Sequence, residues 1–379
     1  MEINNNIVIG ILGGGQLAKM SLLAAAELGF ECAILENHSP SPAGKHTRFE
    51  FTGQIDDKDL FDRFIDASDV ITLESEFIDP KYLRYIESRG KKVFPASVTL
   101  SLIQDKYIQK KSFSDAGVPV AKFSAVEDKV GYHSLSSVLG KKFVLKSRTM
   151  GYDGYGNALV TDQPSFEAGL EKLKSRNAEL MAEEFVPFVK ELAVMVVRTE
   201  HETVFYPVAE TIQVNHICKE VRIPSGISEE QVAEVRRMVT SALDAISARG
   251  IFGFELFLLA NGEILVNEAA PRPHNSGHYT IDGCVTSQFE NHIRAVTGLP
   301  LGSAALIKPY VIMVNLLGKG SGPGYPADYK RPLGDPEVKL HIYGKEKSRK
   351  GRKMGHFTLA GDSGDIYQRA QIIEKETDI

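Results

Sequence analysis

Residues 253–278, with the sequence GFELFLLANGEILVNEAAPRPHNSGH, constrain the fold of this chain more than any other stretch. Two apolar runs flank Asn261-Gly262, a dipeptide that favours a two-residue type I′ turn between antiparallel strands. In the register set by that turn, Glu255 lies opposite Glu268, and both carboxylates lie on one face of the hairpin. The neighbouring side chains predicted on that face are apolar: Phe257, Leu259, Ile264 and Val266.

Two opposed carboxylates need a compensating cation. Their Cβ atoms lie roughly 5 Å apart in such a pair, and the charges repel by roughly 3 kcal/mol at an effective dielectric constant near 20. A small number of oxygen ligands favours Mg²⁺, which keeps part of its water shell and is usually shared with substrate phosphates. The hairpin therefore predicts a magnesium site that serves a nucleoside triphosphate. The alternative is an exposed hairpin with two solvated glutamates.

Composition excludes several classes of function. The 379 residues are 43% hydrophobic and 25% charged, as in an ordinary globular protein of two or three domains. A net charge of −5 gives no general attraction to nucleic acid or to an anionic membrane. The chain has neither a signal peptide's basic start nor a membrane-length apolar run, so we expect a cytoplasmic protein. Its cysteines are isolated, as is typical of reduced thiols: Cys32, Cys218 and Cys284.

The first 95 residues have the pattern of a parallel α/β domain. Strands are expected at residues 7–12, 31–35, 49–52, 70–73 and 92–94, and helices at residues 16–28 and 59–67. The pattern Gly13-x-Gly15-x-x-Ala18, followed by Glu36, is similar to a dinucleotide-binding fingerprint. It supports an alternative function, a nicotinamide-dependent oxidoreductase, and it also suits a phosphate held at the helix start.

The rest of the chain alternates strands and helices around a glycine-rich loop. A helical connection is expected at residues 97–117 and an amphipathic helix at residues 228–248. Strands are expected at residues 141–148, 158–161, 179–186, 191–198 and 203–210. A long loop rich in glycine and proline at residues 317–336 precedes a last small β unit, at residues 338–343 and 356–360.

A lysine and a glycine loop are placed for phosphate chemistry. Lys146 ends an apolar strand just before the segment MGYDGYG at residues 150–156. A flexible glycine loop that closes over phosphates, next to a lysine that reaches them, is what phosphoryl transfer requires. The alternative is a hairpin loop whose glycines serve turn geometry, since the spacing matches neither the standard P-loop nor the kinase glycine loop.

Three more polar segments are candidate binding sites. Backbone groups of residues 183–186 are suited to an adenine edge and Glu191 to ribose hydroxyls, with a solvated acidic turn as the alternative. His274 and His278 are four residues apart, but nearby prolines and a glycine argue against a helix that would bring both onto one zinc ion. That loop is expected to bind an anion or a substrate. The basic segment at residues 345–352 is either a clamp for a substrate phosphate or a solvated turn.

Several motifs together resemble one enzyme family. They are GILGGGQLAKM at the amino terminus, QDK around Lys106, GYDGYG in the glycine loop, NEAAPRPHNSGHYT after the hairpin, SQFENHIRAVTGLPLG, and GRKMGH near the end. On these motifs, which cover nearly the whole chain, the sequence resembles the 5-(carboxyamino)imidazole ribonucleotide synthases of the ATP-grasp superfamily. The runs NEAAPRPHNSGH and RKMGH are the most specific.

The resemblance implies an α/β ATP-grasp fold with an N-terminal Rossmann-like parallel α/β domain and a small C-terminal β-rich domain. The implied domains are residues 1–96, an ATP-grasp domain at residues 97–300 with a mobile lid at residues 118–186, and residues 301–379. A homodimer is expected, with small-molecule substrates and no nucleic-acid or membrane partner.

The resemblance also implies the roles of individual residues. ATP would contact Lys106, Lys146, Gly151, Gly154, Gly156, Glu183, Glu184, Phe185, Val186, Glu191, Asn267 and Glu268. Mg²⁺, or Mn²⁺ in its place, would be held by Glu255 and Glu268. The ribonucleotide would lie against Gly15, Gln16, Leu17, Glu74, Asn275, Ser276, Lys345 and Arg352. The catalytic residues would be Tyr152, Asp153, Arg272, His274 and Lys345, the first four around bicarbonate.

The implied reaction belongs to de novo purine biosynthesis. ATP would phosphorylate bicarbonate to carboxyphosphate, giving ADP. The exocyclic amine of 5-aminoimidazole ribonucleotide would then capture the carboxyl group or the CO₂ released from it, with loss of phosphate. Positive charge near the transferring phosphoryl group and exclusion of water by the glycine loop would favour both steps.

Three segments depart from the family pattern. Tyr155 stands where the glycine loop usually carries Arg or Lys, Thr211 and Gln213 stand where Asn and His are expected, and TLESEF replaces the usual YEFEN. Losing a positive charge near the reacting anions would slow the chemistry or signal a different acceptor. A ligase with another acceptor and a nucleotide-binding regulator are therefore alternatives to the synthase.

Overall fold

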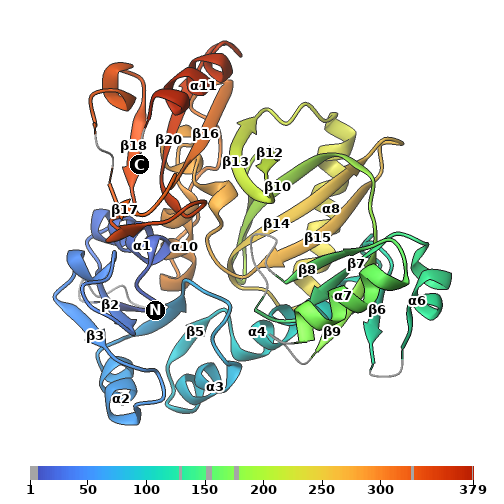
Figure 1. Cartoon of the computed structure of the whole chain (residues 1–379). Coiled ribbons are helices and arrows are strands. Elements are labelled where there is room, and N and C mark those ends of the chain that lie inside the picture. The colour runs from blue at the N-terminus through green and yellow to red at the C-terminus, as the bar shows by residue number, and fades with distance from the viewer. Residues whose placement is uncertain (1–6, 128–129, 151–155, 175–178, 326–327, 378) are drawn as a thin grey trace.

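The computed structural model describes residues 7–127, 130–150, 156–174, 179–325, 328–377 and 379. Its first part is a parallel sheet in the order β3-β2-β1-β4-β5 (Figure 1). The strands are β1 (Val8–Leu12), β2 (Glu31–Glu36), β3 (Phe49–Thr52), β4 (Val70–Leu73) and β5 (Lys92–Phe94), and the helices are α1 (Gln16–Glu27), η1 (Gly44–His46), α2 (Lys58–Asp66) and α3 (Pro80–Ser88). The strand order reverses at β1, so the loops after β1 and β4 meet at one edge of the sheet.

A smaller antiparallel sheet in the order β6-β9-β7-β8 forms the second part. It consists of β6 (Phe123–Val126), β7 (Phe143–Ser147), β8 (Asn157–Val160) and β9 (Leu180–Glu184), with α6 (Tyr132–Leu139) and α7 (Gln163–Lys174). Leu135, Phe143, Phe166 and Leu173 bury one face of this sheet beneath the two helices. Figure 1 shows this part in green, beside the hairpin of the larger sheet.

The largest sheet joins the middle of the chain to its C-terminal part, in the order β15-β14-β10-β12-β13-β16-β20-β18 with β11 paired to β10. Its strands are β10 (Phe188–Arg198), β11 (Thr203–Phe205), β12 (Ala209–Val214), β13 (Ile217–Ile223), β14 (Gly250–Leu259), β15 (Ile264–Ala270), β16 (Tyr310–Leu317), β18 (Lys339–Ile342) and β20 (Lys353–Gly361). The β13–β16 pair carries the sheet from one part to the other, which makes the two parts continuous through backbone hydrogen bonds.

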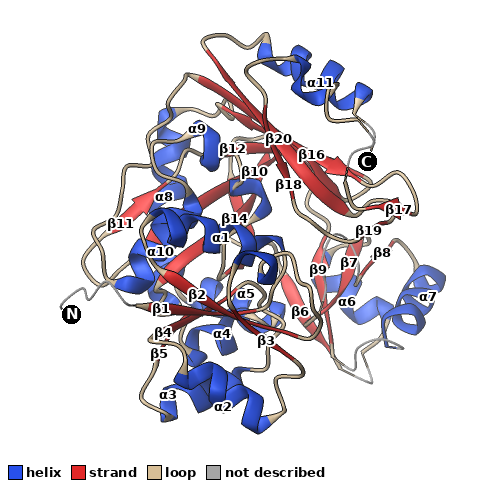
Figure 2. Ribbon diagram, turned by 90° about the vertical axis from the view of Figure 1, so that its left-hand side faces the viewer, coloured by secondary structure: helices blue, strands red, loops and turns tan. Residues whose placement is uncertain are grey.

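Helices cover the large sheet and connect it to the first part. They are α8 (Glu229–Ala245), η2 (Asn275–Gly277), α9 (Thr280–Gly283), α10 (Gln288–Thr297), η3 (Pro332–Gly334) and α11 (Ile366–Glu376), and β17 (Gly322–Pro323) pairs with β19 (Lys347–Ser348) outside the sheet. Phe289, Ile293 and Val296 of α10 pack against α1 in one apolar cluster, so α10 lies between the first part and strands β10 and β14 (Figure 2).

The predicted helical connection at residues 97–117 is in fact two helices, α4 (Ser97–Ile103) and α5 (Lys106–Asp115). The break occurs because the Asp105 side chain accepts hydrogen bonds from the backbone N–H groups of Tyr107 (2.9 Å) and Ile108 (3.1 Å), which starts a new helix. This break places Lys106 in the first turn of α5, where its side chain reaches the large sheet.

Other predictions differ in detail. The strand predicted at residues 203–210 is divided into β11 and β12, and the prediction had no element at α3, β13 or β16. The three cysteines are free thiols, as predicted, and all three are buried. No helix among the described residues has the length and apolar content needed to span a membrane.

Candidate active site

The hairpin of β14 and β15 has a three-residue loop, so the predicted two-residue type I′ turn is wrong. Gly262 has a φ of 88° and donates its N–H to the carbonyl of Leu259 at 3.0 Å. Asn261 does not have the positive φ that a type I′ turn needs at both central residues. Near the loop, Leu258 therefore pairs with Ile264, one residue away from the predicted register.

A β-bulge at Asn267 corrects this offset. Beyond the bulge Glu255 pairs with Glu268, so the predicted opposition of the two glutamates is confirmed. Ile264 and Val266, which were predicted to lie beside the glutamates, are instead buried in the core under α8. The extra residue of a bulge re-aims side chains, and here it lets Asn267 and Glu268 both lie on the face opposite the core.

Lys106 and His274 approach the two glutamates. The Lys106 ammonium forms an ion pair with Glu268, and Nε2 of His274 lies 3.5 Å from Oε1 of Glu255. Burial and the charge of Glu268 raise the pKa of Glu255 to about 8. Burial also acts on Glu268, but the nearby Lys106 charge outweighs it and holds the pKa of Glu268 well below its ordinary value. The pair therefore has unequal proton affinities, and one carboxylate is already neutralised by a cation.

Lys110 lies on α5 one turn after Lys106. The sequence analysis did not predict it as a site residue. Nζ of Lys110 is 2.8 Å from Oε2 of Glu183 and donates to the Asn267 carbonyl at 3.0 Å. Lys146 reaches the other oxygen of Glu183 at 2.7 Å. The i, i+4 spacing of the two α5 lysines was the available signal. Together they place α5 between the small sheet and the large one.

In the segment predicted to bind adenine, residues 183–186, the side chains are buried or contact other residues of the protein. Glu183 is buried, and both of its oxygens contact lysines, while Glu184 accepts from the Lys122 N–H at 2.8 Å. Phe185 is partly exposed beneath the Lys142 ammonium, which lies 3.5 Å from the ring centre, and Val186 is buried. Any contact to a purine edge from Glu183 or Glu184 would therefore come from the backbone.

Glu191 lies on the same face of the large sheet as the opposed glutamates. It pairs with Phe257 of β14 on one side and with Thr211 of β12 on the other. Burial raises the pKa of Glu191, and the Gln213 side chain opposes that shift. Thr211 and Gln213, two of the departures from the family pattern, thus surround the residue predicted to hold ribose.

The glycine turn of the first part is built around Glu74. Its two oxygens accept from the N–H groups of Gly15 (2.5 Å) and Ala18 (3.0 Å). A side chain on Gly13 or Gly15 would overlap Glu74, with a Cβ at 2.5 or 2.6 Å from its nearest atom. Oε2 of Glu36 accepts a hydrogen bond from the Gly14 N–H at 2.8 Å. Carboxylates therefore already occupy donors that a dinucleotide pyrophosphate would use.

The substrate positions predicted at the start of α1 differ in exposure. Leu17 is buried in the core shared with α10, whereas Gln16 is partly exposed at the first position of the helix. The Leu17 side chain therefore packs within the protein.

The loop after β15 is fixed by partners from two other segments of the chain. Arg272 makes a two-pronged ion pair with Glu76, with Nη2 to Oε1 at 2.7 Å, and Glu76 is a residue that the sequence analysis missed. Asn275 exchanges two hydrogen bonds with the Asn315 amide, at 2.9 and 2.7 Å. The departure TLESEF thus supplies the partner of Arg272.

His274 is held as a neutral imidazole. Its Nδ1 lies 2.7 Å from Oγ of Ser276. Burial, together with the charges of Arg272 and Lys353, lowers the pKa of His274 to about 4. The ring therefore contributes hydrogen bonds at neutral pH, and it does not contribute a positive charge.

Basic residues of the C-terminal part reach the same region. Lys345 donates to the Lys353 carbonyl at 2.7 Å, and Arg352 to the Lys347 carbonyl at 2.8 Å. Burial and the charge of Arg352 lower the pKa of Lys345 to about 7, and Glu74 opposes that shift. Lys353, which was not predicted, acts electrostatically on both Glu255 and His274. These interactions show that charged groups from the first, middle and C-terminal parts of the chain lie in one region.

Four predicted positions of the glycine loop, Gly151, Tyr152, Asp153 and Gly154, lie outside the described residues, as does Tyr155. Gly156 follows directly, and its carbonyl accepts from the Ser147 N–H at 2.8 Å. Gly156 is therefore held at the end of β7, next to Lys146.

Comparisons with known proteins agree with this architecture. The chain matches the ribonucleotide synthetase preATP-grasp domain at residues 7–104, the ATP-grasp domain at residues 111–289, and the phosphoribosylaminoimidazole carboxylase C-terminal domain at residues 311–370. It is 38% identical to the N5-carboxyaminoimidazole ribonucleotide synthase of Bacillus subtilis, over 95% of this chain and 93% of the relative. It is 41% identical to the phosphoribosylaminoimidazole carboxylase of Ogataea methanolica, over 97% of this chain.

The chain spans only part of the carboxylases that it resembles, at 69% of the Ogataea protein and 64% of the Candida albicans protein. Solved structures match it end to end. The Aspergillus clavatus carboxyaminoimidazole ribonucleotide synthase complexed with ATP is 34% identical, with a TM-score of 0.89 over 98% of this chain and 99% of that one. The Thermotoga maritima enzyme is 39% identical, with a TM-score of 0.86 over 98% and 99%. The predicted ATP-grasp fold is confirmed, and the chain belongs to the N5-carboxyaminoimidazole ribonucleotide synthase family of ATP-grasp ligases.

Proposed function

We propose that this chain carboxylates 5-aminoimidazole ribonucleotide, using ATP and bicarbonate, to N5-carboxyaminoimidazole ribonucleotide, ADP and phosphate. Family membership supports this reaction, and so does an Aspergillus clavatus relative solved with ADP and 5-aminoimidazole ribonucleotide, at 32% identity and a TM-score of 0.88. The observation that carries the proposal for this chain is the opposed Glu255–Glu268 pair, with Lys106 beside it. The oxidoreductase alternative does not account for that pair.

The residues present suit a divalent cation bound together with ATP. Glu255 and Glu268 offer carboxylate oxygens from opposed positions, and Oδ1 of Asn267 is a buried acceptor without a partner among the described residues. An all-oxygen set of this kind favours Mg²⁺. When bound, Mg²⁺ would neutralise charge on the phosphates. The chain's own Lys106, which pairs with Glu268 here, would supply a positive charge beside those phosphates.

The remaining ATP contacts follow from position. Lys146 lies at the base of the glycine loop, and Phe185 and Val186 lie at the junction of β9 and β10, where backbone groups suit an adenine edge. Glu191 faces the same side as the glutamate pair and suits the ribose hydroxyls. Lysine charges stabilise the transferring phosphoryl group without a covalent step. Bicarbonate is already an anion, so its attack needs no strong base.

The ribonucleotide is proposed to lie between the first part and the C-terminal part. Glu74 at the glycine turn and Lys345 interact electrostatically, so a carboxylate of the first part and an amine of the C-terminal part lie near each other. Lys345 and Arg352 suit the substrate phosphate. Arg272 and His274, with Tyr152 and Asp153 of the glycine loop, are proposed to line the bicarbonate site between the two substrates.

ADP release tests the proposed reaction directly. We would measure it with Mg-ATP and bicarbonate, with and without 5-aminoimidazole ribonucleotide. Release that depends on the ribonucleotide and yields the carboxylated product is the expected result. ATP binding without such stimulation would contradict the proposal and favour another acceptor or a regulatory role.

The pKa of Lys345 predicts how substrate binding depends on pH. A pKa of about 7 means that the free enzyme loses this positive charge as the pH rises above that value. Attraction for the substrate phosphate then weakens, so KM for the ribonucleotide should rise by up to about tenfold per pH unit above neutrality. Lys345→Arg, which keeps its charge, should have a KM that is flat across this range. An identical rise in both proteins would rule out Lys345 as its source.

The lowered pKa of Lys345 also sets the sign of its effect on stability. Between the folded pKa and the ordinary value of 10.5, the unfolded chain binds more protons than the folded one. This group therefore makes the folded state more stable as the pH rises through that window. As the pH falls back through the window the stability decreases, and below about 7 the effect is constant.

Tyr155 gives a prediction from the sequence. Tyr155→Arg restores the positive charge usual in the family, and it should raise turnover if tyrosine is a loss of function at this position. We would compare kcat for ribonucleotide-dependent ADP release in the two proteins. An unchanged or lower kcat would show that this chain has adapted to tyrosine.

Three further predictions concern the domain organisation, the oligomeric state and the location of the protein. The divisions at residues 96 and 300 and a mobile lid at residues 118–186 are proposed as the domain organisation. A homodimer and a cytoplasmic location are likewise proposed.

A further inference from the structure

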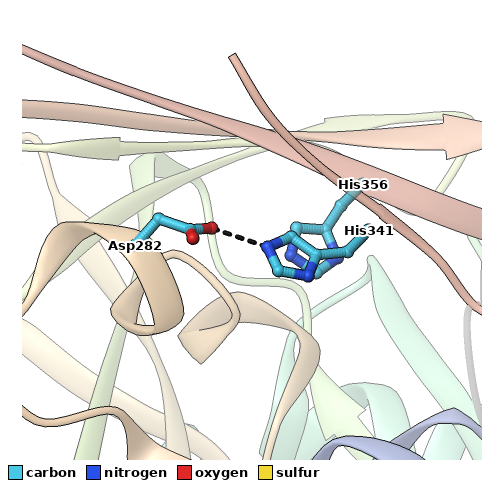
Figure 3. Close-up of side chains that lie close together, drawn as sticks. All are labelled: Asp282, His341 and His356. Atoms are coloured by element: carbon cyan, nitrogen blue, oxygen red, sulfur yellow. Dashed lines mark hydrogen bonds and ion pairs between the residues drawn. The ribbon is translucent and has the colours of Figure 1, made fainter. Parts of the chain in front are cut away.

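A group of histidines lies where the C-terminal strands meet α9. His341 of β18 and His356 of β20 are directly paired across the sheet, and their rings stack with centroids 4.6 Å apart and planes 16° apart. Asp282 of α9 reaches Nε2 of His341 with its Oδ2 at 2.7 Å. One ligand atom from each of the three residues lies within 4.8 Å of the other two. Figure 3 shows the two rings stacked one behind the other, with the Asp282 carboxylate approaching His341 from the facing helix.

His356 has a nitrogen that the fold leaves unused. The side chain is completely buried, and its Nδ1 lies 3.0 Å from the Tyr343 hydroxyl. Its Nε2 is buried and makes no hydrogen bond within the described part of the chain. A buried polar atom without a partner destabilises the folded state. A hydrogen bond from Nδ1–H to Tyr343 would leave the Nε2 lone pair available, which is how a metal-bound imidazole is usually oriented.

We propose that Asp282, His341 and His356 form a binding site for a divalent transition-metal ion such as Zn²⁺. Two imidazole nitrogens and one carboxylate suit Zn²⁺ and similar ions better than Mg²⁺, which prefers oxygen ligands. The site is distinct from the Glu255–Glu268 pair in both residues and donor chemistry. It also differs from the pair His274 and His278, for which the sequence argued against a shared zinc ion.

The position of the site indicates what the ion does. Asp282 belongs to the connection that follows the Arg272 loop, whereas the two histidines belong to the outer strands of the large sheet. One ion would therefore tie α9 to β18 and β20, and it would stabilise the start of β20, where Lys353 lies. The Asp282 and His341 side chains are 16% and 29% exposed, so an ion can reach the site from solvent.

Cobalt binding tests this site in the full chain. We would remove metals with a chelator, titrate Co²⁺ without ATP, and follow the visible absorption that nitrogen and oxygen ligands produce. We expect a saturable spectrum that Zn²⁺ displaces. His341→Ala should weaken Co²⁺ binding by more than about tenfold, and Tyr343→Phe by about 10–100-fold with a similar spectrum, since it removes only the outer hydrogen bond.

Two matched controls separate this site from others. Glu268→Gln alters the proposed nucleotide-metal site, and His201→Ala removes an exposed histidine; both should keep the wild-type Co²⁺ affinity. Asp282→Asn, which preserves the shape of the side chain, should lose affinity as His341→Ala does, so a folding defect in one variant would not hide the result. A spectrum unchanged by either ligand substitution, or abolished by Glu268→Gln or His201→Ala, would overturn the proposal. Loss of the synthase reaction alone would not affect it.

Discussion

Replacing Glu268 by glutamine is expected to lower kcat for ribonucleotide-dependent ADP release by about a thousandfold, or ~4 kcal/mol of transition-state stabilisation. Glu268 is one of two opposed carboxylates, and its loss would leave Glu255 to hold a divalent cation alone. The fold should remain intact, because Lys106 lies within electrostatic reach of Glu255 as well. The measurement is steady-state turnover at saturating Mg-ATP, together with circular dichroism.

Glu263→Gln is the matched control, because Glu263 is an exposed residue at the loop of the same hairpin. It removes the same charge from the same hairpin without touching the paired carboxylates, and it should keep wild-type turnover. Excess Mg²⁺ should restore part of the Glu268→Gln rate if the lost step is cation binding. Wild-type activity in Glu268→Gln would show that this carboxylate is not part of the cation site.

Replacing Lys110 by methionine is expected to have the largest effect on stability. The Lys110 and Glu183 side chains are each only 3% exposed, with 2.8 Å between Nζ and Oε2. Removing one partner of a buried ion pair costs roughly 3–5 kcal/mol. The loss here should lie near the lower end, about 3 kcal/mol, because Lys146 still contacts Glu183. Urea unfolding followed by circular dichroism would measure the decrease.

A second substitution distinguishes an unpaired charge from lost packing. Lys110→Met combined with Glu183→Gln removes both charges, so it should recover part of the stability lost in Lys110→Met alone. Lys111→Met is the surface control, because Lys111 pairs with Asp115 in an exposed i, i+4 contact; its effect on the free energy of unfolding should be much smaller than that of Lys110→Met. A double variant no more stable than Lys110→Met would assign the loss to packing.

Local patterns predicted the first part of the fold well. The strands at residues 49–52, 70–73 and 92–94 were predicted with the bounds that the structure has, because buried parallel strands appear as short apolar runs between turns. The break at Asp105 was missed, since a capping aspartate inside a helical pattern is recognised only by the hydrogen bonds that it makes. The hairpin loop was misassigned because Asn-Gly fits more than one turn type.

The candidate site was less predictable than the fold. Glu255 and Glu268 follow from counting residues outward from a turn, but their pairing in fact depends on a bulge at Asn267 that compensates for a different loop. Glu76, Lys110 and Lys353 were missed because each acts across long separations in sequence. For a single charged residue in a helix or loop, the surrounding sequence does not predict which distant residue it will contact.

The sequence by itself determined the family, the parallel first domain and the apolar runs that form the sheets, because these depend on residue type and short-range spacing. Only the tertiary structure decided how the parts combine. The β13–β16 pair joins the middle and C-terminal parts into one sheet, and Lys110 links the small sheet to the large one through Glu183 and the Asn267 carbonyl. Contacts of this kind are settled by burial and charge neutralisation between distant segments, for which the order of residues along the chain carries no local signal.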